Sequence, residues 1–200
     1  MIEPIEKIGE LIASCRVCND RFAATATAHR PRPVFWCEPT AKLLVAGQAP
    51  GARVHASGVF FDDASGERLR DWMGLDRTTF YDRRRIAILP MAFCFPGYDR
   101  NGSDLPPPTV CARLWRNRVI AQLPDVRTTL LIGRHAQLWH LGDRARCGVR
   151  ELVEGWRDHA PEYFPMPHPS WRNNALVAGL KGFEEELLPA LQKRVRELLS

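Results

Sequence analysis

The segment KLLVAGQAPG (residues 42–51) joins a short apolar run to a turn that has a glycine at each end. Residues 42–47 predict a buried β-strand, because a short run without polar alternation is typical of a sheet covered on both faces. The two glycines let the backbone turn sharply and approach a ligand closely, and exposed amides in such a turn hold a base oxygen or a phosphate. An ordinary strand-to-helix loop is the alternative interpretation. The residues of this turn are Gly47, Gln48, Ala49, Pro50 and Gly51.

Further short apolar strands alternate with helices along the chain. This alternation predicts an α/β fold of three layers (αβα) with a central, mostly parallel four-stranded sheet, in one domain over residues 1–200. Functional residues of such sheets lie at the carboxyl ends of the strands. The predicted strands are 42–47, 85–89, 128–133 and 162–166, the predicted helices are 4–14, 66–72, 109–123, 134–141 and 173–199, and residues 99–108 are a predicted loop.

Length and composition are ordinary for a globular domain. The chain of 200 residues is long enough to bury a core, no apolar run approaches the roughly 20 residues that span a bilayer, and residues 1–10 lack a signal-peptide core. We therefore expect a cytoplasmic monomer outside the membrane. The net charge is +5, and only four of the 28 basic residues are lysines. Such arginine content favours nucleic acid as partner, although a GC-biased genome also enriches arginine.

Two later segments add groups suited to a planar ligand. In GVFF (residues 58–61) one phenylalanine is expected in the core, and the other is able to stack on a base. In PHPSWRNN (residues 167–174) the prolines stiffen the loop around His168, which as a neutral imidazole is able to donate to a developing anion. The alternative for this second segment is a surface turn in which an asparagine caps the last helix.

Six cysteines in a cytoplasmic chain are not expected to pair as disulfides. Four of them form a CxxC pair and a distant pair that flanks the 99–108 loop, a pattern able to make a four-sulfur cage for Zn or an iron–sulfur cluster. A redox pair or two core cysteines are alternatives for the CxxC motif. Cys37 and Cys147 are expected to be free core thiols. The predicted metal ligands are Cys15, Cys18, Cys94 and Cys111.

In their order and spacing these motifs resemble the uracil-DNA glycosylase superfamily, and most closely its iron–sulfur bacterial and archaeal branch. The resemblance extends over roughly residues 10–175. That branch has a CxxC helix, a strand ending in GEAPG, a Gly…Phe…Gly stretch, two further cysteines, an LxxG strand end and an HPS motif. The corresponding segments here are Cys15/Cys18, Gly47–Gly51 (motif A), Gly58…Phe61…Gly66, Cys94 and Cys111, Leu130–Gly133 and His168–Ser170.

The resemblance implies a role for each matching residue. Motif A lines the pocket for a flipped base, Phe61 stacks on that base, and His168 hydrogen-bonds the departing anion. The four cysteines hold a 4Fe-4S cluster, with Zn as the alternative. DNA contacts are expected from Arg53, Ser170, Trp171, Arg172 and Asn173.

Several positions depart from the family pattern. Ala49 stands where the best-known family has an aspartate, and Gln48 stands where the iron–sulfur branch has a glutamate. Gln48 is able to position water but not to act as a base. Pro90 replaces the asparagine that reads a pyrimidine, so it offers the base only a carbonyl. His55 lies where the branch has an acidic residue, and is either a general base or nucleophile, or a surface histidine, which we favour.

The sequence therefore predicts a DNA glycosylase that excises uracil or another deaminated base from DNA by hydrolysis of the N-glycosidic bond. One rival is a superfamily member with weakened catalysis that binds abasic or single-stranded DNA, which the lost acidic residues favour. A redox protein built around the cysteines is a second rival, but it leaves the motif A and HPS loops unexplained.

Overall fold

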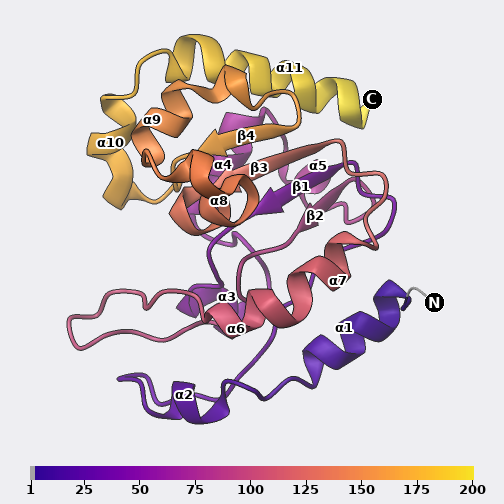
Figure 1. Cartoon of the computed structure of the whole chain (residues 1–200), viewed down its shortest axis with the longest axis vertical. Coiled ribbons are helices and arrows are strands. Elements are labelled where there is room, and N and C mark those ends of the chain that lie inside the picture. The colour runs from indigo at the N-terminus through magenta and orange to yellow at the C-terminus, as the bar shows by residue number, and fades with distance from the viewer. Residues whose placement is uncertain (1–2) are drawn as a thin grey trace.

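The computed structural model describes residues 3–200 and contains a four-stranded, all-parallel sheet (Figure 1). Its strands are β1 Leu43–Ala46, β2 Ile86–Ile88, β3 Thr128–Ile132 and β4 Tyr163–Met166, in the order β2-β1-β3-β4. In the register, Leu43 lies opposite Ile86 on one side and Thr128 on the other. Every residue of β1, β2 and β3 is buried, which explains why these strands read as unbroken apolar runs. The predicted sheet is confirmed.

Helices cover both faces of the sheet, as a three-layer fold requires (Figure 1). They are α1 Ile5–Ala13, α2 Asn19–Ala23, α3 Ala52–Ser57, α4 Ala64–Met73, α5 Arg77–Phe80, α6 Thr109–Cys111, α7 Asn117–Ile120, α8 Gly133–Leu141, α9 Val149–Glu154, α10 Asn174–Ala178 and α11 Leu188–Leu199. A π-helical turn, Ala112–Arg116, joins α6 to α7, and a second, Phe183–Leu187, precedes α11. Short 3-10 turns occupy Gly142–Ala145, Trp156–Asp158 and Trp171–Asn173.

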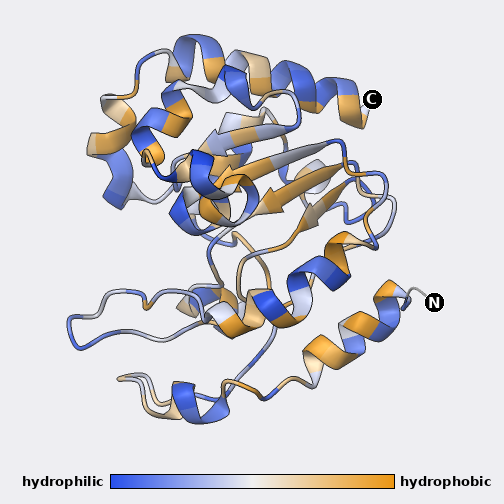
Figure 2. Ribbon diagram, viewed as in Figure 1, coloured by the Kyte–Doolittle hydropathy of each residue, from blue (hydrophilic) through white to orange (hydrophobic). Residues whose placement is uncertain are grey.

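Alternate residues of β1 divide the core into two faces. Leu43 and Val45 belong to the cluster that includes buried residues of α4, α9 and α11. Leu44 belongs to the cluster that includes α1 and α7, and Ala46 packs with residues of α8. This alternation is the period of two of a strand. Figure 2 accordingly shows apolar strands between outer helices, such as α1 and α11, that carry both polar and apolar residues.

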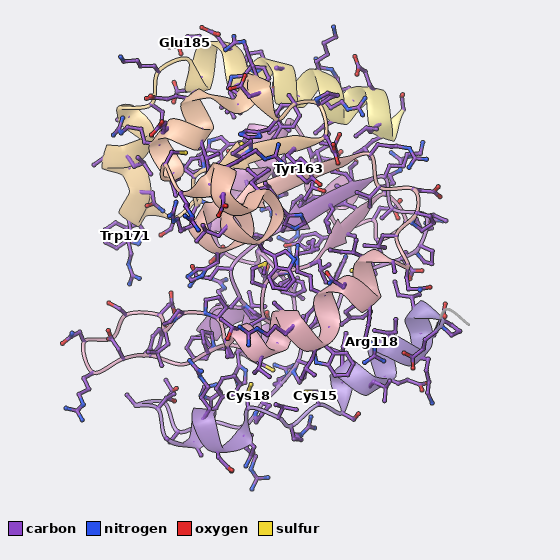
Figure 3. All side chains as sticks on the ribbon, viewed as in Figure 1. Cys15, Cys18, Arg118, Tyr163, Trp171 and Glu185 are labelled. Atoms are coloured by element: carbon purple, nitrogen blue, oxygen red, sulfur yellow. The ribbon has the colours of Figure 1, made fainter. Side chains whose placement is uncertain are left out.

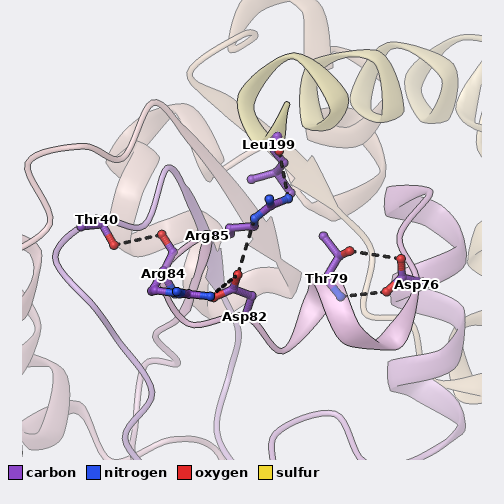
Figure 4. A network of polar contacts seen from close by, with 7 residues as sticks. All are labelled: Thr40, Asp76, Thr79, Asp82, Arg84, Arg85 and Leu199. Atoms are coloured by element: carbon purple, nitrogen blue, oxygen red, sulfur yellow. Dashed lines mark hydrogen bonds and ion pairs between the residues drawn. The ribbon is translucent and has the colours of Figure 1, made fainter.

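The turn before β2 is held by its own ion pairs (Figure 4). Arg84 and Arg85 both pair with Asp82, at 3.1 and 3.5 Å. Arg85 also donates to the carbonyl of Leu199 at 2.9 Å, which ties this turn to the end of α11. The arginines of this turn therefore have partners within the fold.

None of the helices within residues 3–200 has the length and apolar composition needed to cross a membrane.

Candidate functional site

Motif A and the segment after β2 continue side by side beyond the ends of their strands. The backbone N–H of Met91 donates to the carbonyl of Gly47 at 2.9 Å, and that of Ala92 donates to Gln48 at 3.2 Å. Gly47 and Pro90 are buried, whereas Gln48 is only half-buried. The structure thus brings motif A and Pro90 together at the carboxyl edge of the sheet, as the sequence predicts.

Phe61 lies against motif A. A Cβ added to Gly47 would be 3.9 Å from the Cζ of Phe61, so the ring reaches the start of the motif. Phe61 has a positive φ of 54°, which is unusual for a residue with a side chain, and its carbonyl accepts from the Tyr81 hydroxyl at 3.1 Å. Its neighbour Phe60 is 3% exposed and belongs to the core. This division between a core phenylalanine and a second one beside motif A is the one the sequence predicts.

The loop after β4 holds His168 in a defined tautomer. The backbone N–H of Ser170 donates to Nδ1 of His168 at 3.2 Å, and the side-chain amide of Asn173 donates to the carbonyl of His168 at 3.0 Å. The first bond needs a lone pair on Nδ1, so the neutral ring carries its proton on Nε2. Gly133, at the end of β3, lies beside the histidine, since an added Cβ there would be 3.8 Å from His168 Cβ.

The charges of two carboxylates from other parts of the chain act on the pKa of His168. Burial lowers the pKa of His168 below its usual 6.5, and the charges of Asp63 and Asp104 oppose that shift. Asp63 is the N-cap of α4, where its Oδ1 accepts from the N–H of Gly66 at 2.9 Å. The sequence analysis missed Asp63. The signal available was an aspartate before a predicted helix, which indicates a cap but not a place near His168.

The carbonyl of Pro90 is already engaged. It accepts from Nη1 of Arg116 at 3.1 Å, and the carbonyl of Leu89 accepts from the same nitrogen at 2.7 Å. Arg116 is 1% exposed, and burial lowers its pKa to about 10. Its Nη2 lies 2.6 Å from Nε2 of His140. The sequence analysis missed this arginine, which fixes the edge of the sheet beneath Pro90.

A buried glutamine hydrogen-bonds the backbone carbonyls of β3 and β4, as Arg116 does for the carbonyls after β2. The side-chain amide of Gln137 donates to the carbonyls of Leu131 and Met166, at 3.3 and 3.0 Å. It therefore joins the ends of β3 and β4 two residues before His168. This residue was also not foreseen.

His55 lies in different surroundings from His168. Its ring centroid is 5.1 Å from that of His29 and 6.0 Å from that of Phe95, and its Nδ1 is buried without a hydrogen-bond partner. Burial, then the charges of His29 and Arg32, lower the pKa of His55. His55, expected as a surface histidine, is half-buried, because helix α3 turns its ring toward His29, which follows α2, and Phe95, which follows β2.

The predicted DNA-contacting residues divide into two kinds. Trp171 is 74% exposed and projects from the molecule (Figure 3), with the guanidinium of Arg172 5.9 Å from its ring. Ser170 and Asn173 instead hold the loop itself. The hydroxyl of Ser170 accepts from the N–H of Arg172 at 3.3 Å. Arg53, on α3, is exposed.

The four predicted metal ligands line one small cavity of about 20 Å³. Burial and the charges of neighbouring thiolates raise the pKa of Cys94 to about 12, and burial raises that of Cys111 to about 11. The N–H of Phe93 points at Cys111 Sγ, 3.4 Å away. Within residues 3–200 no three histidines, cysteines or carboxylates are arranged to hold a single metal ion. Figure 3 shows Cys15 and Cys18 on the segment that joins α1 to α2.

The two cysteines outside the predicted metal site differ from each other in burial. Cys37 is buried, as expected, and burial raises its pKa to about 12. The expectation that Cys147 is a core thiol is wrong: it is exposed, because it lies in the turn between α8 and α9, outside the core clusters.

The fold is that of an α/β protein whose candidate functional residues follow the carboxyl ends of parallel strands. Residues 34–192 match the family model of the uracil DNA glycosylase superfamily, and the chain belongs to this superfamily. The matched region contains motif A, Phe61, Asp63 and His168, but not Cys15 and Cys18.

Proposed function

We propose that this protein is a DNA glycosylase that hydrolyses the N-glycosidic bond of uracil or a related deaminated base. One observation carries the proposal: the Phe61 ring lies against motif A, while the His168 loop presents an Nε2–H donor fixed by Ser170. A stacking surface and an oriented donor are what a departing base anion needs.

The reaction follows from these groups. A base flipped out of DNA stacks on Phe61, and motif A contacts its edge through backbone amides. As the glycosidic bond breaks, the sugar gains positive charge and the base gains negative charge. His168 donates through Nε2–H to the anionic base oxygen. The Asp63 carboxylate caps α4 and its charge acts on the same histidine; in this proposal it stabilises the sugar cation or orients water, which Ala49 cannot do.

Gln48 takes a smaller part in this proposal, and His55 takes none. The Gln48 side chain is half-buried beside Ala92, where its amide is able to hold the attacking water. His55 has no such place in the scheme, since its ring packs against His29 and Phe95.

The deciding experiment is a base-release assay over oligonucleotides that contain uracil, hypoxanthine, xanthine or an oxidised pyrimidine, in single and double strands. Release of at least one base supports the proposal. Binding of these oligonucleotides without release, at high enzyme concentration, would instead identify a DNA-binding superfamily member that has lost catalysis.

The electrostatics of His168 give a prediction for the pH profile. Because the folded-state pKa lies below 6.5, the neutral donor persists at neutral pH, and kcat falls only as the pH drops through the lowered pKa. Asp63→Asn removes a charge that raises this pKa. We expect the acid limb of the kcat profile to move to lower pH, and the plateau to fall because the carboxylate is lost.

Asparagine keeps the helix cap, so the Asp63 variant should remain folded. The matched control is Asp76→Asn, which alters the equivalent cap of α5, where Asp76 accepts from the N–H of Thr79 at 2.8 Å. An acid limb that moves upward in Asp63→Asn, or moves equally in the control, would contradict the assignment.

We also propose that the four cysteines hold a 4Fe-4S cluster, with Zn as the alternative. The donor set fits, because four thiols line one cavity, and burial, then the charges of neighbouring thiolates, raise the pKa of Cys18, Cys94 and Cys111, a cost that binding to a cationic centre offsets. Its contribution would be structural, joining the α1–α2 segment to α6.

Cys15→Ser tests this site. Cys15 is only half-buried, so loss of packing is small, and we expect loss of bound metal together with a lower midpoint of thermal unfolding. Cys147→Ser, an exposed thiol, is the control. Iron with acid-labile sulfide identifies a cluster, and zinc alone identifies the alternative. Unchanged metal content and stability in Cys15→Ser would refute the cage.

A further inference from the structure

The segment between β2 and α6, predicted as an irregular loop, contains a formed hairpin over residues 97–105. Tyr98 and Asp104 make an antiparallel bridge, and the N–H of Leu105 donates to the carbonyl of Gly97 at 2.9 Å. The Asp99 carboxylate accepts from the N–H groups of Asn101 and Ser103, at 2.8 and 2.9 Å. The hairpin tip is therefore fixed by local hydrogen bonds, and Asp99 is occupied by them.

The base of the hairpin is anchored on the segment that follows α2. Gly97 has a φ of +94°, and an added Cβ would lie 2.8 and 2.9 Å from the hydroxyls of Thr25 and Thr27, so the two segments are in close contact. The Tyr98 ring packs on Phe95 with centroids 5.0 Å apart. Between the segments is an open hollow of about 410 Å³, lined by Ala24, Thr25, Ala26, Tyr98, Asp99, Arg100 and Leu105.

The hairpin carries one of the two charges that act on His168. Asp104, on its returning strand, opposes the lowering of the His168 pKa. The hairpin also projects from the same side of the molecule as Trp171 (Figures 1 and 3). Trp171 and the hairpin are therefore two projections on one side of the molecule.

The tip carries a cation that the fold does not use. Arg100 is exposed, and among the ion pairs of residues 3–200 it has none, whereas Arg146 and Arg157 pair with Asp143 and Glu186. The hollow beside Arg100 combines the Tyr98 side chain with small residues. An unpaired guanidinium next to an aromatic side chain in an open hollow suits a nucleotide phosphate and its base.

We propose that the hairpin 97–105 is a second DNA-binding arm, in which Arg100 contacts a phosphate and the hollow beside Tyr98 receives a flanking unpaired nucleotide. This inference rests on the proposed function and adds a second grip on the strand. A phosphate contact by Arg100 would add to the DNA contacts expected from Trp171 and Arg172, which the structure places on a separate loop.

The test compares Arg100→Ala with Arg196→Ala, an exposed arginine on α11, in equilibrium binding to single-stranded DNA. We expect Arg100→Ala to weaken binding about fivefold and to reduce the salt dependence of log Kd by about one unit of slope, with Arg196→Ala unchanged. Tyr98→Leu should weaken binding without changing the slope.

Equal DNA affinities and equal salt dependence of log Kd for Arg100→Ala and Arg196→Ala would overturn the proposal that the hairpin binds DNA. Because binding is measured separately from base release, the two proposals fail differently. Arg100-dependent binding with no release of any base would refute the glycosylase and leave the arm intact.

Discussion

Replacing His168 by alanine is expected to lower kcat for base release by roughly 10²–10³-fold, equivalent to about 3–4 kcal/mol of transition-state stabilisation. The reason is that the Ser170 N–H engages Nδ1 at 3.2 Å, which leaves Nε2–H as an oriented donor. This donor meets full negative charge only as the base departs. KM should change little, since the ground-state base carries no such charge.

Single-turnover kinetics on the best substrate from the base-release assay measure this effect. His159→Ala is the matched control, because His159 is half-buried like His168 but lies in the turn before β4. Unlike that of His168, the Nδ1 of His159 has no hydrogen-bond partner. A His168→Ala enzyme with wild-type kcat would show that the histidine is a structural part of the loop only.

The sheet was predictable because its strands carry the simplest signal. All four predicted strands overlap the observed ones, since short apolar runs without alternation occur where both faces are covered. Helices α2, α3, α5 and α9 were missed because each has only four to six residues. A helix of one turn shows no period of 3.6 residues to detect.

The site was predictable only in part, for reasons of geometry. Motif A, Phe61 and His168 were identified by the order of motifs along the chain, and the structure places Phe61 beside motif A. Arg116 could not be foreseen, because a helical arginine is normally exposed. It is buried because Leu89 and Pro90 leave carbonyls at the edge of the sheet that require a donor.

Replacing Gly66 by alanine is expected to have the largest effect on stability. Helix propensity alone would make alanine stabilising by about 1 kcal/mol inside α4. The new Cβ, however, would lie 1.8 Å from the carbonyl oxygen of Phe61 and 2.7 Å from its Cβ. Backbone cannot move aside as a flexible side chain does, and the Phe61 carbonyl is further bound by Tyr81 and Arg70. We expect a loss of about 3 kcal/mol or more in the free energy of unfolding.

Chemical denaturation of Gly66→Ala and Gly51→Ala separates the clash from the general effect of removing a glycine. Gly51 has an ordinary φ of −81°, and an added Cβ meets nothing within 4 Å, so alanine there should be neutral or stabilising by about 0.5 kcal/mol through the unfolded state. Equal stabilities of the two variants would mean that the turn at Phe61 is free to move. In the Gly66→Ala molecules that still fold, Phe61 has to shift to admit the new Cβ. These molecules should therefore also have a lower kcat/KM, because the Phe61 ring no longer lies against Gly47.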